Sequence, residues 1–128
     1  CAFDSDVDTL RFSVAQDQVF KPNSLEISDF GTKVLDKVGR LIASYKGYVQ
    51  IIGHTDEDRL KGAPASTFEV SLTRAVAVMK HLGKARLLDE ERVTPQGTGD
   101  RKPLASEEVD GEPRRNRRIE FVLSKTKP

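Results

Sequence analysis

Cysteine is almost absent from the sequence, in which Cys1 is the single example among 128 residues. One cysteine cannot form an internal disulfide and cannot build a multi-cysteine zinc site, so both kinds of support are excluded. The redox compartment therefore stays undetermined. The position of Cys1 fits two interpretations: a chain cut from a longer protein, or a mature lipoprotein whose signal peptide ended just before a lipid-modified cysteine.

Long apolar runs and an excess of one charge are missing as well. The apolar stretches are a handful of residues long, far short of the roughly 20 that a membrane-spanning helix needs. The 21 Lys and Arg residues nearly balance 20 Asp and Glu residues, which gives a formal charge of +1, so no overall field attracts nucleic acid or anionic lipid. Because 128 residues are too few for two ordinary domains, we expect one compact domain.

The strong catalytic signatures are also absent, since the sequence has no P-loop, paired CxxC, HExxH or GxSxG motif. Of the two histidines, His54 could act with Asp56 as an acid–base pair or as a metal ligand. His81 lies on an expected helix, where a packing or surface role is more frequent than ligation. We predict no catalytic, metal or cofactor site, and keep a hydrolase that uses His54 and Asp56 as an alternative.

What the sequence does contain is a regular spacing of apolar residues that predicts the fold. We expect strands at Leu10–Val14, Tyr48–Ile52, Arg92–Gly97 and Ile119–Leu123, helices at 25–45 and 72–83, and polar loops at His54–Thr67 and Thr98–Arg115. The order βαβαββ predicts an α/β (α+β) sandwich, in which a mixed β-sheet carries the helices on one face.

Five short patterns occur in a fixed order along the chain. They are Phe20 with Ser24 and Leu25; GHTD at 53–56; VSLTRA at 70–75, close to an LS..RA pattern; Gly97, Gly99 and Pro103; and NRR at 116–118. Together they resemble the OmpA-like C-terminal domain of bacterial envelope proteins. The matching part is residues 20–123, roughly four-fifths of the chain. Residues 1–19 would be an N-terminal segment with the first strand, and 124–128 a loose tail.

The resemblance implies a non-catalytic domain that binds peptidoglycan, mainly at the meso-diaminopimelate residue of the stem peptide. This ligand group has a free amine beside a carboxylate. We expect Asp56 to pair with the amine and Arg74 to bind the carboxylate through two parallel hydrogen bonds. The alternative is that Asp56 and Arg74 pair only with each other, which would contribute little if the pair is exposed.

The resemblance implies further ligand-binding residues around this pair: Thr55, Asn23, Thr67, Leu72, Asn116, Arg117 and Arg118. Alternate residues entering a strand face opposite ways, so we expect one arginine of the NRR pattern to reach the pocket and the other to be solvated. The arginines at 114–118 could form a nucleic-acid patch, but they lack interleaved aromatic residues, and nucleic acid is not expected as a partner.

Three positions depart from the family pattern. Thr67 stands where the family commonly has Asn, Phe68 where the MotB-type branch has Trp, and Pro113 where the family commonly has Arg. The loop around Phe68 is most similar to the MotB-type branch. These departures keep a third hypothesis open, a protein-interaction domain that retained the fold and lost the ligand.

The resemblance implies a periplasmic domain attached to the cell envelope, with two alternatives for the parent protein. A lipid-modified Cys1 would indicate a Pal-like lipoprotein of the outer membrane, whereas an upstream transmembrane helix would indicate a MotB-like stator subunit of the inner membrane. In the second case a homodimer is one alternative for the oligomeric state, because dimerisation is common in the MotB-type branch.

Overall fold

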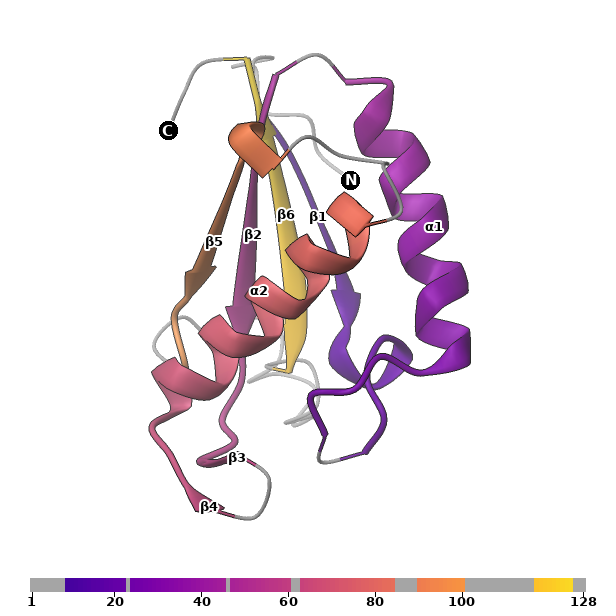
Figure 1. Ribbon diagram of the computed structural model, residues 1–128. Helices are drawn as coiled ribbons and strands as arrows, with labels where there is room; N and C mark the ends of the chain where they lie inside the picture. The colour runs from indigo at the N-terminus through magenta and orange to yellow at the C-terminus, as the bar shows by residue number, and fades with distance from the viewer. Residues whose placement is uncertain are drawn as a thin grey trace, which may run out of the picture.

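The protein folds into a four-stranded sheet covered by two helices, shown in the computed structural model of Figure 1. The structure describes residues 9–22, 24–45, 47–60, 63–84, 90–100 and 117–125. The main elements are β1 (Thr9–Ala15), α1 (Asp29–Ala43), β2 (Tyr48–His54), α2 (Thr67–Lys84), β5 (Val93–Gly97) and β6 (Arg118–Ser124), with short 3-10 turns η1 (Gln16–Gln18) and η2 (Glu90–Arg92).

The sheet has the spatial order β1-β6-β2-β5. Strand β6 runs antiparallel to both β1 and β2, and β5 runs parallel to β2, with α2 in the connection between them. Both helices lie on the same side of this mixed sheet (Figure 1). The predicted α/β sandwich with its βαβαββ order is therefore confirmed for the main elements.

The core lies between the sheet and the helices. Phe121 is fully buried at the middle of β6, where it is paired with Phe12 of β1 and Ile51 of β2, and the two phenylalanine rings stack with centroids 5.2 Å apart. The helices contribute Leu35, Val38, Ile42, Ala75, Val78 and Leu82 to the same cluster. Burying such side chains contributes about 1.5–3 kcal/mol each, before the entropy cost of folding is counted.

Both helices begin where a serine caps them, not where the apolar spacing begins. The Ser28 hydroxyl accepts a hydrogen bond from the Gly31 amide, so α1 starts at Asp29 and not at Leu25. At α2, the Glu69 amide donates to the Ser66 hydroxyl while the Ser66 amide donates to the Glu69 carboxylate. This reciprocal capping box starts the helix at Thr67, five residues before the expected start at Leu72.

The remaining differences are small. The segment expected to be a plain loop contains a two-stranded ribbon of β3 (Arg59–Leu60) and β4 (Ala63–Pro64), and β6 is one residue longer at each end than expected. Within the described residues, neither helix combines the length and the apolar character needed to cross a membrane. The predictions for Cys1, for Pro113 and for residues 126–128 lie outside the described residues.

Candidate functional site

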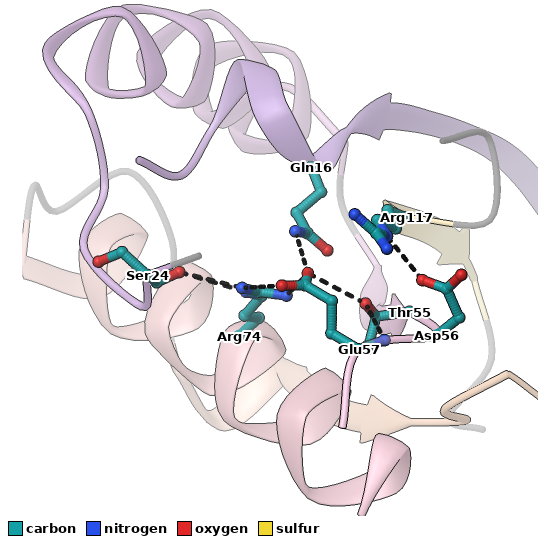
Figure 2. A network of polar contacts seen from close by, with 7 residues as sticks. All are labelled: Gln16, Ser24, Thr55, Asp56, Glu57, Arg74 and Arg117. Carbon is teal, nitrogen blue, oxygen red and sulfur yellow. Dashed lines mark hydrogen bonds and ion pairs between the residues drawn. The ribbon is translucent and has the colours of Figure 1, made fainter. Parts of the chain in front are cut away.

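Several predicted site residues, Thr55, Asp56, Arg74 and Arg117, come together at one end of the sheet. Because β6 is antiparallel to its two neighbours, its first residue, Arg118, lies opposite Ala15 at the end of β1 and His54 at the end of β2. The turn after β1, the segment after β2 and the residue before β6 therefore meet. Helix α2 lies beside them and contributes Arg74 (Figure 2).

Two glycines let α2 lie close enough to reach this end of the sheet. A Cβ atom on Gly53 would lie 2.1 Å from the Ser71 carbonyl oxygen, so any larger residue would push the helix away. Gly99 has a positive φ of 60°, which favours glycine. Its amide donates to the Ser71 hydroxyl, and its carbonyl accepts from the Thr55 amide. The GHTD, LS..RA and G.G patterns thus contact one another, which explains their joint occurrence.

His54 supports this junction from inside the protein. Its side chain is 4% exposed; Nε2 lies 2.9 Å from a Glu120 carboxylate oxygen and Nδ1 lies 2.9 Å from the Thr98 hydroxyl. The hydrogen bond from His54 outweighs the effect of burial and lowers the pKa of Glu120. Since both ring nitrogens are engaged, His54 is poorly placed to act with Asp56 on a ligand, and the geometry favours a structural role.

Arg74 is almost completely enclosed. Its side chain is 3% exposed, and its guanidinium lies over the Phe20 ring, 5.6 Å from the centroid. Nε and Nη2 donate to the Ser24 carbonyl, at 3.4 and 3.2 Å. On the other side, Nη1 and Nη2 donate to the two carboxylate oxygens of Glu57, at 2.6 and 3.4 Å. Glu57, which the sequence patterns did not single out, therefore binds Arg74, the arginine that was expected to bind a ligand carboxylate.

Glu57 is the centre of the polar network in Figure 2. Besides Arg74, it accepts a hydrogen bond from the Gln16 amide at 2.5 Å and a longer one from the Thr55 hydroxyl at 3.3 Å. Burial alone would raise the pKa of Glu57, but the hydrogen bonds from Arg74 and Gln16 and the charges of Arg74 and Arg117 outweigh it, so the pKa is lowered. Glu57 is therefore a carboxylate at neutral pH.

Asp56 pairs with Arg117, not with Arg74. The Arg117 Nε atom donates to Asp56 Oδ1 at 2.6 Å, and this bond outweighs desolvation and raises the pKa of Arg117. Both side chains are accessible, with exposed fractions of 37% for Asp56 and 40% for Arg117. The alternative of a direct Asp56–Arg74 pair is therefore wrong, because each residue has a closer partner from another segment.

The two arginines before and in β6 differ in burial. Arg117 reaches the site, as expected of one of them. Arg118 is 6% exposed, so the expectation that the other would be solvated is wrong. Its place opposite His54 in the sheet, where its charge helps to lower the pKa of Glu120, accounts for the difference.

An open pocket of about 580 Å³, part of it open solvent, lies beside this network. Its lining comes from three segments: Gln16 and Asp17 in η1, residues 20–22 after it, and Glu57 with Arg117 at the ends of β2 and β6. The lining therefore combines two carboxylates, of Asp17 and Glu57, with two cations, of Lys21 and Arg117, beside the apolar Phe20 and Pro22 side chains. Arg74 lies behind Glu57, outside this lining.

The other predicted ligand-binding residues lie at different places. Thr55 is 1% exposed and supports Glu57 through its hydroxyl. Thr67 starts α2 close to Gly99, and Leu72 lies against Gly97. Among the described residues, no hydrogen bond joins Thr67 or Leu72 to Asp56 or Arg74. Their ligand roles stay predictions, and Asn23 and Asn116 lie outside the described residues.

Within the same described ranges, no group of three or more His, Cys, Asp or Glu side chains is placed to hold a metal ion. Two acid–guanidinium pairs, one enclosed and one accessible, each contribute one side chain to the pocket lining, namely Glu57 and Arg117. Such an arrangement suits the recognition of a small charged group by ion pairs and hydrogen bonds.

Two solved bacterial structures are similar to this fold. The cell wall anchor of the T6SS from Pseudomonas aeruginosa is 25% identical, with a TM-score of 0.78 over 97% of this chain and 87% of that one. A MotB-like protein from Desulfovibrio vulgaris is 28% identical, with a TM-score of 0.79 over 94% of this chain and 75% of that one.

A sequence relative is the uncharacterized protein YtxE of Bacillus subtilis, which is 27% identical over 95 residues, or 73% of this chain. The chain spans only 39% of the length of that relative. The model of the OmpA family matches residues 19–117, which include the GHTD, LS..RA and G.G patterns and the arrangement of charged residues described above. The predicted resemblance is confirmed, and the chain belongs to the OmpA family.

Proposed function

We propose that this domain binds the stem peptide of peptidoglycan, without catalysing a reaction, and thereby attaches an envelope protein to the bacterial cell wall. The observation that carries the proposal is the accessible Asp56–Arg117 pair beside the enclosed Arg74–Glu57 pair at an open pocket. Membership of the OmpA family and the similarity to a cell wall anchor support it.

The ligand group that fits best is the side-chain end of diaminopimelate. Its ammonium can replace the Arg117 guanidinium at Asp56, because that pair is accessible and an exposed ion pair contributes only about 0–1 kcal/mol. Arg117 then becomes available to the rest of the stem peptide. Arg74 acts on the side of the pocket that faces the neighbouring carboxyl group through Glu57, which it holds in the lining.

A second candidate function is a protein-interaction domain that has lost wall binding. The observation in its favour is that Glu57 and the Ser24 carbonyl already engage the Arg74 guanidinium.

We extend the first proposal to location, a periplasmic domain attached to the envelope. The parent protein is either a lipoprotein or a stator-like membrane subunit, and in the latter case a homodimer is the expected state.

Co-sedimentation with purified diaminopimelate-type sacculi tests the proposal. We expect the native domain to pellet, and Asp56→Ala and Arg74→Ala to bind at least about tenfold more weakly. Asp56→Ala loses the charge-assisted hydrogen bond to the ligand ammonium, and Arg74→Ala releases Glu57 from its position at the pocket. Asp58→Ala and Arg40→Ala are matched controls at exposed positions and should pellet like the native domain. Thermal unfolding must show that Arg74→Ala is folded, since this side chain is enclosed.

A native domain that stays in the supernatant with both amidated and non-amidated sacculi would reject wall binding and favour the interaction domain. Full pelleting of Asp56→Ala would place the binding surface elsewhere on the protein. Intact sacculi after prolonged incubation are expected, because we propose no catalysis.

A further inference from the structure

We propose that Glu57 occupies the place of a ligand carboxylate at Arg74 and thereby makes the pocket selective for stem peptides in which the carboxyl group beside the diaminopimelate amine is amidated. The inference rests on the proposed function, and concerns the charge of the ligand that the site accepts. It assigns a specificity-determining role to Glu57, which none of the sequence patterns includes.

The first argument is the geometry around Arg74. The two oxygens of Glu57 face Nη1 and Nη2, which is the two-point arrangement that a free carboxylate adopts on a guanidinium. The Ser24 carbonyl takes Nε and Nη2, and the Phe20 ring covers one face. A ligand carboxylate could reach this arginine only by displacing Glu57.

Displacement of Glu57 is unfavourable because of its burial. Its side chain is 12% exposed, and removing its cation would leave a carboxylate that water reaches poorly. The bonds from Gln16 and Thr55 would remain, but neither donor carries a charge. The Glu57–Arg74 pair is therefore expected to persist when a ligand enters, and Arg74 is a positioning residue.

The second argument is the charge that the pocket presents. Among the residues that line the pocket, Asp17 and Glu57 balance Lys21 and Arg117, so the lining has no net charge. Without Glu57, the same site would carry an excess positive charge and would favour a free carboxylate. With Glu57 in the lining of the pocket, a ligand carboxylate beside it meets a like charge, whereas a carboxamide brings two N–H donors and no charge.

The amine of the ligand completes the match. An amidated diaminopimelate end carries one positive charge, on its ammonium, and the accessible Asp56 can take this group once Arg117 moves aside. The carboxamide can then donate to Glu57. A stem peptide with a free carboxylate carries an ammonium and a carboxylate at this end, and it lacks the hydrogen bond from the carboxamide to Glu57.

Isothermal titration with two soluble stem peptides tests the inference. The peptides differ only in a carboxylate or a carboxamide beside the diaminopimelate amine. We expect the native domain to bind the amidated peptide at least about tenfold more tightly, because juxtaposed like charges cost several kcal/mol. Glu57→Gln should lose this preference or reverse it, since Arg74 then has no internal carboxylate. Asp58→Asn, an exposed neighbouring change, should keep the preference of the native domain.

A native domain that prefers the peptide with the free carboxylate would overturn the inference. A Glu57→Gln variant that binds both peptides more weakly by the same factor would also overturn it, because that result indicates a purely structural role for Glu57. In both cases sacculi binding would still support the proposed function. If neither peptide binds and sacculi also stay unbound, the proposed function fails and the inference fails with it. The comparison of the two peptides on the native domain needs no variant, so it remains decisive if Glu57→Gln does not fold.

Discussion

Replacing Arg74 with methionine keeps a long side chain at this position but removes the guanidinium that Glu57 and the Ser24 carbonyl share. The variant leaves Glu57, which is 12% exposed, as a carboxylate without its cation. Removing one partner of a buried ion pair costs about 3–5 kcal/mol, and we expect about 3 kcal/mol here because Glu57 retains some contact with water. This loss would be a large part of the stability of a domain of this size.

A double-mutant cycle separates the ion pair from general packing. Glu57→Gln should also destabilise the protein, since it leaves Arg74 enclosed without a counter-charge. The double variant Arg74→Met with Glu57→Gln contains no uncompensated charge, so its loss should be smaller than the sum of the single losses by about 1–3 kcal/mol. Urea unfolding followed by circular dichroism gives each free energy of unfolding.

The exposed Arg40 provides the control for the cycle. Arg40→Met should change the free energy of unfolding by less than about 0.5 kcal/mol. If the losses in free energy of unfolding of the two single variants add up to that of the double variant within about 0.5 kcal/mol, the Glu57–Arg74 coupling is refuted. That result would also remove the basis for the specificity-determining role of Glu57.

Three further predictions concern the same region. The pKa of Glu57 is lowered from 4.5, so its stabilising contribution is complete above that pH and is lost as the pH falls through the folded value; the difference in free energy of unfolding between native protein and Glu57→Gln should shrink in an acid titration. Gly53→Ala should cost about 1–3 kcal/mol in thermal unfolding, because the new Cβ overlaps the Ser71 carbonyl; an unchanged melting temperature would contradict this packing. Ser66→Ala should cost about 1 kcal/mol through loss of the capping box with Glu69, and unchanged helix content and stability would count against that cap.

The spacing of apolar residues predicted the main strands and helices because each of them packs apolar side chains into the core, as the stacked Phe12 and Phe121 illustrate. The helix starts were less predictable, since the Ser28 and Ser66 caps lie in polar segments that the apolar spacing does not detect. Attention to the pattern of Ser66 followed three residues later by Glu69 would have found the start of α2.

Sequence reasoning named Asp56, Arg74 and Arg117, which lie close together, but it did not predict how they pair, and it missed Glu57. The family patterns indicated these three residues. Three consecutive acids, Asp56, Glu57 and Asp58, follow β2, and a sequence does not show which acid turns toward which arginine. The need of a buried arginine for a carboxylate was the available signal for Glu57. Burial of Arg118 was missed because alternation assigns opposite faces of a sheet without showing whether the second face is covered.

The difference in exposure between the two acid–guanidinium pairs argues for different tasks. Opening the Asp56–Arg117 pair exposes charges that water already reaches, so it costs about 0–1 kcal/mol, whereas opening the Arg74–Glu57 pair costs about 3–5 kcal/mol. A ligand ammonium can therefore exchange with Arg117 at little cost, while a ligand carboxylate would need to offset the larger cost at Arg74. On the proposed function, reversible wall binding then depends on the accessible pair, and the enclosed pair fixes the pocket and the charge of the ligand that fits it.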